Sequence, residues 1–140
     1  MNLADWHRKQ ADSPCRRPKL PALARARAGW RWRELALRYG EAVILEHALL
    51  PVVPGREAEF EAAFAEAKVI ISAMPGFVDL QLSRSIETPN EYLLLVHWES
   101  VEAHEQGFRG SAEYVRWRAL LHHFYERFPV VEHFAEVHRA

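Results

Sequence analysis

The sequence predicts an α+β domain of the ferredoxin-like, split βαβ type, in which helices cover one face of a four-stranded antiparallel sheet. Two observations predict this fold class. The chain has 140 residues, of which 49% are hydrophobic and 26% charged, and this composition suits one domain with one core. From residue 43 onward, strand-like and helix-like hydrophobic periodicities follow each other in the order β-α-β-β-α-β.

The first β-α-β unit spans residues 42–84. Residues 42–50 are β-branched and aliphatic and are ended by proline and glycine, which predicts a strand closed by a turn. From Arg56 the apolar residues recur at three- and four-residue steps, which is typical of an amphipathic helix. Pro75 and Gly76 end this helix, and residues 77–84 then alternate between apolar and polar side chains as a strand does.

The second unit follows a turn around Pro89. Residues 92–98 form a strand that is apolar on both sides. Ser100 and Ser111 are suited to cap a short and a longer helix, and residues 130–137 return to an extended pattern. Because a small protein with such an apolar third strand leaves one sheet face uncovered, we expect a homodimer.

Composition excludes several other classes of protein. Five Trp, seven Phe and four Tyr supply too much apolar surface for a disordered chain. The single cysteine, Cys15, excludes a disulfide scaffold. The longest apolar runs have the length of a strand, far below the ~20 residues that cross a bilayer. We therefore expect a cytoplasmic protein without a membrane partner.

Residues 1–42 form a basic N-terminal extension, and residues 43–140 form the domain. Residues 1–40 carry a net charge of +7, whereas residues 41–140 carry −8. The extension could be a nucleic-acid-binding arm, a targeting segment, or a disordered tail or leader translated from a start codon placed too early. We expect the last, because Val43 can be encoded by the bacterial start codon GUG. The acidic domain argues against a nucleic-acid partner.

The familiar sequence signatures of catalysis are missing. The chain has no glycine-rich phosphate loop, no paired-cysteine metal site and no nucleophile elbow. His47, His97 and His133 fall on the first, third and fourth strands, which are neighbours in this fold. They could form a metal site if they shared one face. Histidines hydrogen-bonded at a dimer interface are the alternative that we expect, and we predict no metal.

Several runs resemble the antibiotic biosynthesis monooxygenase family over residues 43–137. They are 43–47, 53–55, 74–77 and 98–100, followed by His104, Phe108, residues 111–114 and Arg118. The resemblance implies a dimeric α+β barrel with a ligand cavity between sheet and helices. The best understood branch of the family oxidises phenolic polyketides to quinones with dioxygen, without a metal or organic cofactor.

The resemblance also suggests site residues. That branch uses an Asn and a Trp on the third strand, followed by a Tyr and an Arg. Trp98 and Arg118 match, whereas His104 stands at the Tyr position and Leu94 at the Asn position. His104 would act as general base, Arg118 would stabilise an oxyanion and Trp98 would exclude water. The predicted ligand-pocket residues are His47, Leu94, Phe108, Tyr114 and Phe124.

The haem-degrading branch of the same superfamily fits less well. Its first-strand Asn falls near Ala48, its pocket Trp near Phe108 and its iron-binding His near Trp117 or Arg118. We therefore predict a cofactor-independent monooxygenase that acts on a small aromatic, phenol- or quinol-like substrate with dioxygen. The alternative is a non-catalytic dimeric module of the same fold that binds a small ligand or serves in a stress response.

Overall fold

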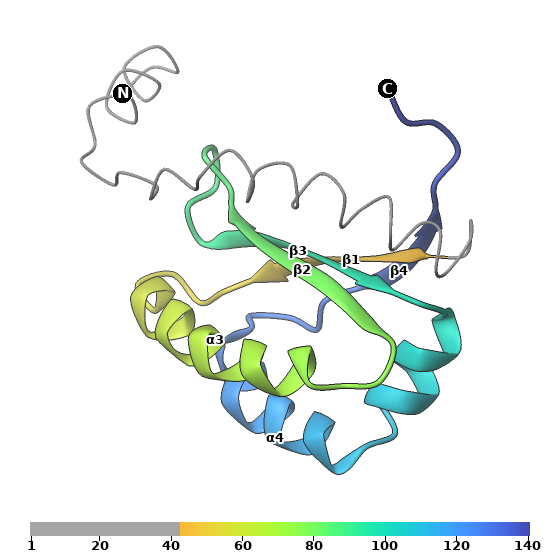
Figure 1. The fold of residues 1–140 in the computed structure, drawn as a ribbon. Helices are drawn as coiled ribbons and strands as arrows, with labels where there is room; N and C mark the ends of the chain where they lie inside the picture. Colours follow the sequence, from red (N-terminus) through yellow and green to blue (C-terminus); the bar gives the residue numbers. More distant parts are fainter. Residues whose placement is uncertain (1–42) are drawn as a thin grey trace, which may run out of the picture. The chain divides into compact units, whose positions relative to one another are not determined.

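The computed structural model describes residues 43–140, and Figure 1 shows their fold. The interpretations of the basic extension lie outside these described residues. The elements follow one another in the predicted order. They are β1 (Ile44–Pro51), α3 (Glu57–Ser72), β2 (Phe77–Arg84), β3 (Glu91–Trp98), η2 (Ala103–Phe108), α4 (Ala112–Leu121), η3 (His122–Phe124) and β4 (Val131–Ala135). Here η2 is a π-helix and η3 a 3₁₀ turn.

The four strands form one sheet in the order β2-β3-β1-β4, with every neighbouring pair antiparallel. This is the predicted ferredoxin-like arrangement, so the fold class is confirmed. Helices α3 and α4 lie on the same side of the sheet (Figure 1). None of the helices in residues 43–140 is both long enough and apolar enough to cross a membrane.

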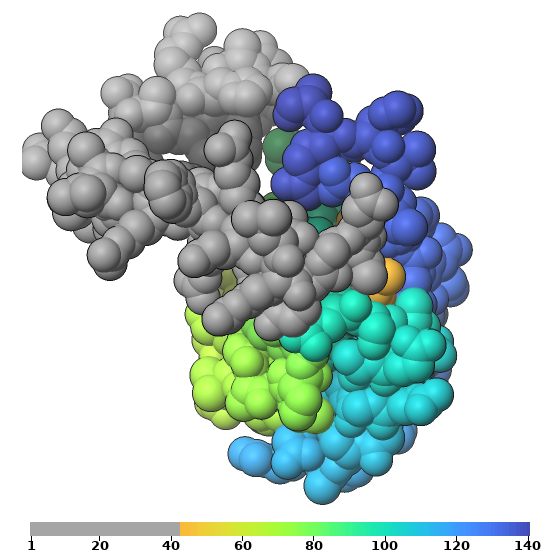
Figure 2. Space-filling model, turned by 45° about the vertical axis from the view of Figure 1, so that its right-hand side comes forward, coloured from red at the N-terminus to blue at the C-terminus, as the bar shows by residue number. Residues whose placement is uncertain are grey.

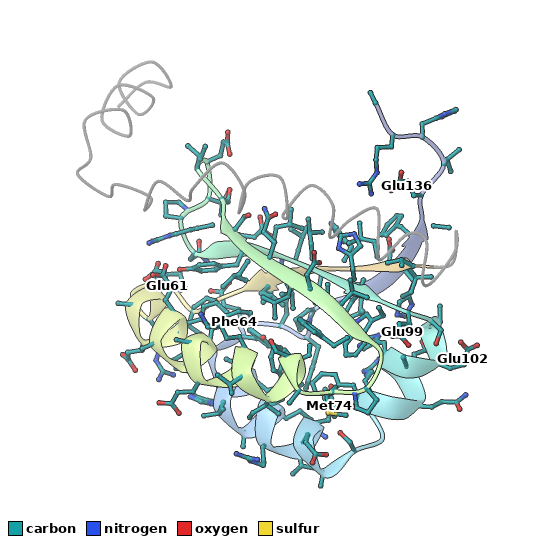
Figure 3. All side chains as sticks on the ribbon, viewed as in Figure 1. Glu61, Phe64, Met74, Glu99, Glu102 and Glu136 are labelled. Atoms are coloured by element: carbon teal, nitrogen blue, oxygen red, sulfur yellow. The ribbon has the colours of Figure 1, made fainter. Side chains whose placement is uncertain are left out.

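Strand alternation decides which side chains enter the core. Along β3 every second residue is buried, from Tyr92 to Trp98, because successive side chains point to opposite faces. On the same face of β1, Ala48 and Leu50 are buried as well. From α3, Phe64 points toward the sheet, as Figure 3 shows, and its ring packs edge-on against Trp117 of α4. The core therefore lies between the sheet and the two helices.

The serine caps predicted from sequence are present. The Ser100 hydroxyl accepts a hydrogen bond from the Ala103 amide at 3.1 Å, just where η2 begins. The Ser111 hydroxyl accepts one from the Tyr114 amide at 3.2 Å, at the start of α4. These bonds satisfy amide groups that have no partner within the first helical turn.

Gly76 brings η2 close to the start of β2. Its φ of 81° lies in the left-handed region, and a Cβ at this position would stand 2.6 Å from the Ala103 Cβ. The Gly76 carbonyl also accepts a hydrogen bond from the Glu99 amide at 2.8 Å. Figure 2 shows η2, in turquoise, directly beside the end of α3, in light green. This close approach places η2 over the end of β3.

Candidate functional site

A buried carboxyl group lies where β1 meets the end of β3. Register pairs Ile44 with Trp98, so Glu46 is the next residue of β1 on the same face. Glu46 is 6% exposed and Trp98 is fully buried. The Trp98 indole Nε1–H donates a hydrogen bond to Glu46 Oε2 at 2.7 Å. This bond fixes the carboxyl group on the helix-facing side of the sheet.

His104 reaches the same point from η2. The Arg109 amide donates to the His104 carbonyl at 2.9 Å, a five-residue step that makes this turn wider than an α-helical one. His104 is 3% exposed, and its ring stacks on Trp98 with 5.4 Å between ring centroids. Its Nε2 lies 3.4 Å from Glu46 Oε2. The π-helix thus holds an imidazole between an indole and a carboxyl group.

His133 on β4 completes the cluster. Register pairs it directly with Glu46, so it lies on the helix-facing side of the sheet. Its Nε2 is 2.8 Å from His104 Nδ1, a hydrogen bond in which one ring donates and the other accepts. His133 is only partly buried. We call Glu46, His104 and His133 the acid–base chain.

Burial shifts the pKa values of Glu46 and His104 in the directions that favour their uncharged forms. It raises the pKa of Glu46 to about 7, although the Trp98 hydrogen bond and the charge of Arg109 oppose the shift. It lowers the pKa of His104 to about 4, and His133 and Arg109 act in the same direction. At neutral pH, His104 is therefore uncharged and Glu46 is close to its midpoint. The 3.4 Å contact between them joins a neutral imidazole to a titrating carboxyl group, not two ions.

Aromatic side chains surround the acid–base chain on the side of the sheet that the helices cover. Phe108 stacks on Trp98 with 5.8 Å between centroids, and Tyr114 and Trp117 pack edge-on against Phe108. Of the predicted pocket residues, Leu94, Phe108 and Phe124 are between 2% and 4% exposed and belong to the core, while Tyr114 is partly buried beside them. The structure brings these four to the same side of the sheet as His104.

The structure separates the three strand histidines. His47 and His97 lie on the face of the sheet opposite to the helices, whereas His133 faces them. His47 packs edge-on against Phe134 at 5.6 Å, and His97 Nδ1 is 2.7 Å from Asp79 Oδ1. The idea of one three-histidine metal site is therefore wrong, and His47 lies away from His104. Within residues 43–140, no three side chains of the His, Cys, Asp and Glu types are grouped to hold a metal ion.

Arg118, the predicted oxyanion group, lies on the exposed side of α4. Its guanidinium carbon stands 5.9 Å from the centroid of the Tyr114 ring. Burial lowers the pKa of His122, and the charges of Arg118 and Arg109 lower it further. The cation whose charge reaches Glu46 and His104 is instead Arg109, which also lies 5.8 Å from the Tyr114 ring.

Sequence reasoning therefore missed two groups, Glu46 and Arg109, and gave His133 a different role. A signal for Glu46 was available. It shares the alternation of Ala48 and Leu50, so it is an acidic residue on the apolar face of a strand. Such a residue needs a buried partner, and this requirement could have drawn attention to it.

The sequence of this chain is similar to those of known proteins. The family model described as antibiotic biosynthesis monooxygenase matches residues 43–120. The uncharacterised protein YczJ of Bacillus subtilis is 52% identical over 95 residues, which is 68% of this chain and 100% of that protein. A haem oxygenase (mycobilin-producing) of Mycobacterium tuberculosis is 33% identical over 63 residues, covering 45% of this chain and 60% of that protein.

Solved structures give the same result. A protein of Bordetella bronchiseptica that carries this family's name is 41% identical, with a TM-score of 0.66, over 69% of this chain and 98% of that one. SnoaB of Streptomyces nogalater, a cofactor-independent oxygenase, is 23% identical with a TM-score of 0.53, over 70% of this chain and 93% of that one. At this identity, the likeness to SnoaB is one of fold.

Proposed function

The chain belongs to the antibiotic biosynthesis monooxygenase family, and we propose that it oxidises a small phenol- or quinol-like molecule with dioxygen. The observation that carries this proposal is the acid–base chain beneath Trp98. Glu46 and His104 are both buried and titratable. The pKa of Glu46 lies above its value in water, and the pKa of His104 lies below its value in water. Groups with environments that push pKa values in opposite directions are typical of acid–base sites.

The proposed reaction needs a base at the start. A phenol resists oxidation, whereas its phenolate passes an electron to dioxygen. A quinol gives two electrons and two protons to dioxygen and leaves as the quinone, with hydrogen peroxide as the second product. With a phenol, the oxygen species formed bonds to the ring carbon opposite the hydroxyl, which carries a hydrogen. One oxygen atom stays on that carbon as the second quinone carbonyl. The other leaves as water, which contains the hydroxyl hydrogen and the ring hydrogen. The substrate supplies both electron pairs, so this balance requires no further reductant and no cofactor.

His104 and Trp98 have the properties that this chemistry asks for. A neutral imidazole can accept a proton, and burial keeps His104 neutral at physiological pH. Trp98 is fully buried, and its stacked ring excludes water from one side of His104. Exclusion of water strengthens each electrostatic interaction around a forming phenolate. In this proposal, Leu94, Phe108, Tyr114 and Phe124 supply the apolar side of the substrate site.

Two arginines could hold the developing oxyanion. Arg118 occupies the position suggested by the family, and Arg109 is the one whose charge reaches Glu46 and His104. Both guanidinium groups approach the ring of Tyr114, so a substrate oxygen near Tyr114 would meet either of them. We assign the role to Arg109 and keep Arg118 as the comparison.

We do not extend the proposal to haem degradation. The iron-binding histidine of that branch falls near Trp117 or Arg118, and neither side chain offers an imidazole. Trp117 is also 5% exposed and packs within the core against Phe64 and Phe108. The residues at these positions do not fit an axially ligated haem.

A second copy of the chain is the partner that we propose for the sheet face opposite α3 and α4, which no helix within residues 43–140 covers. The apolar side chains there include Leu49 and Phe134, each 45% exposed. A Leu49→Lys variant should sediment as a monomer under conditions where the native chain is a dimer, because the charge would be buried at the interface. The control is Val69→Lys on α3, where Val69 is 66% exposed. A monomeric native chain at micromolar concentration would overturn this part of the proposal.

The function itself is tested with a panel of phenols and quinols. Ligands are selected by the rise in melting temperature that they cause, and oxygen consumption and quinone absorbance are then measured. We expect turnover by the native chain and by His138→Phe, an exposed control, but not by His104→Phe, which keeps a ring against Trp98. Binding without oxygen consumption would instead support the non-catalytic ligand-binding alternative. Neither binding nor turnover across the panel would refute the proposal.

A further inference from the structure

Both ring nitrogens of His104 already face protein groups. Its Nδ1 is hydrogen-bonded to His133 Nε2 at 2.8 Å, and its Nε2 points at Glu46 Oε2 from 3.4 Å. A base that takes a proton from a substrate needs a nitrogen that the substrate can reach. His104 could offer one only by giving up a partner inside a site where it is 3% exposed.

His133 offers the nitrogen that His104 lacks. Its Nε2 is used by His104, whereas its Nδ1 has no hydrogen bond to the described part of the chain. His133 is also the least buried member of the acid–base chain, because it lies on β4 at the edge of the sheet. A substrate hydroxyl can therefore approach its Nδ1 without breaking the contacts behind it.

We propose that the acid–base chain is a proton relay in which His133 takes the hydroxyl proton of the substrate and Glu46 receives a proton through His104. The proposal rests on the oxygenase function given above and deepens it. It makes His133 the catalytic residue of the three. Glu46 and His104 act through His133, as positioning residues that determine where its proton goes.

The relay conserves every proton. At the start, His133 and His104 each carry their proton on Nε2, and Glu46 is a carboxylate. The substrate hydroxyl gives a proton to His133 Nδ1, and the Nε2 proton of His133 passes to His104 Nδ1. The Nε2 proton of His104 then passes to Glu46 Oε2. After this transfer, both imidazoles are neutral in the opposite tautomer, Glu46 is a carboxylic acid and the substrate is a phenolate. The same steps in reverse return the proton to the oxygen atom that leaves as water, which restores the Glu46 carboxylate and both starting tautomers.

The electrostatics of the site favour this direction. A relay through two tautomers forms no imidazolium, and burial and Arg109 make an imidazolium at His104 costly. Burial also makes the carboxylate of Glu46 costly, so Glu46 gains from taking up the proton. Trp98 Nε1 holds Oε2 in place from the other side. The 3.4 Å gap between His104 and Glu46 is the one link that must shorten for transfer.

The first test needs no substrate. In protein labelled with ¹⁵N-histidine, the nitrogen shifts of His104 report which ring nitrogen carries the proton. Above pH 7, the Glu46 carboxylate should hold the proton of His104 on Nε2. Below pH 7, the Glu46 acid should donate to Nε2 and move the proton to Nδ1. We expect this tautomer change in the native chain and in the exposed control Glu66→Gln, but not in Glu46→Gln. A fixed tautomer, or an unaltered change in Glu46→Gln, would overturn the relay.

The second test uses a phenol that the native chain oxidises. We expect kcat to fall at least tenfold in His133→Asn and in Glu46→Gln, with KM nearly unchanged. The acidic limb of the native pH profile should also vanish in Glu46→Gln, because that limb follows protonation of Glu46. Full activity of His133→Asn would overturn the relay even if the oxygenase function stood. Conversely, a tautomer change without turnover of any phenol would refute the oxygenase function and leave only the proton coupling between Glu46 and His104.

Discussion

The pH dependence of stability should have opposite signs in two single variants, Glu46→Gln and His104→Gln. Burial raises the pKa of Glu46 from 4.5 to about 7 in the folded chain. The folded state therefore binds a proton that the unfolded state releases, and stability is lost as the pH rises from 4.5 to 7. Burial lowers the pKa of His104 from 6.5 to about 4, so this group loses stability as the pH falls from 6.5 to 4.

The two effects are nearly equal in size. Each corresponds to about 3 kcal/mol, at about 1.4 kcal/mol for each pH unit by which a pKa moves on folding. In the native chain they offset each other, so the pair adds little slope between pH 4 and 8. Glu46→Gln keeps the His104 effect alone, and its stability should rise by about 3 kcal/mol between pH 4 and 7 relative to the native chain. His104→Gln keeps the Glu46 effect alone and should lose about as much over the same range.

Urea unfolding followed by far-ultraviolet circular dichroism measures both slopes at half-unit steps of pH. Glu66→Gln, a change at an exposed glutamate of α3, is the control and should follow the native curve. Subtracting the native curve removes the titration of all other groups. Parallel curves for all four proteins would refute the claim that burial shifts these two pKa values.

Three further predictions concern the groups that hold the site. Gly76→Ala should lower the free energy of urea unfolding by at least about 1 kcal/mol more than Gly55→Ala does. Both glycines have positive φ, but only at Gly76 would a new Cβ meet Ala103. Equal losses would show that this crowding is unimportant. Trp98→Phe should cost about 2–4 kcal/mol, since it removes the indole hydrogen bond to buried Glu46 and part of a core ring. It should also raise the pKa of Glu46 further, as carboxyl infrared absorption would show. With an accepted phenol, Arg109→Met should lower kcat more than Arg118→Met, and the reverse order would return the oxyanion role to Arg118.

The elements of the fold could be predicted because their hydrophobic periods are local. The strand expected at 77–84 is observed with those bounds, and the one expected at 92–98 begins a single residue earlier. The last strand was expected over 130–137 and is shorter, at Val131–Ala135. This strand ends at Ala135 because Ala135 pairs with Ile44, the first residue of β1. The local sequence of the last strand does not show where its partner strand begins.

Register could not be predicted, and it decides the fate of the strand histidines. A shift of one residue moves a side chain to the opposite face, so neighbouring strands alone do not bring histidines together. Pairing of Glu46 with His133 places His133 under the helices, while the adjacent residue His47 faces the other way. The sequence positions of the three histidines were compatible with either outcome.

The candidate site was half predictable for a related reason. Trp98 follows from the family resemblance because it matches the family's Trp, and His104 follows because it stands at the position of the family's Tyr. Glu46 does not follow from it. Its role depends on a hydrogen bond to Trp98, 52 positions away, and on a contact with His104 of the π-helix. The hydrogen bond between His104 and His133 spans 29 positions. Only the folded arrangement assembles these groups.

The cost of Glu46 is itself an argument for its role. A structural need at this position would be met by glutamine, whose carbonyl can accept the Trp98 hydrogen bond without the penalty of a buried charge. At pH 8 the carboxylate costs about 3 kcal/mol, a large part of the stability of a small domain. Retaining such a group is understandable where its proton is used. If Glu46→Gln both stabilises the chain at pH 8 and abolishes the tautomer change of His104, then Glu46 lowers the stability of the fold and is needed for proton transfer. If it stabilises the chain and leaves His104 and turnover unaltered, Glu46 has no part in the chemistry.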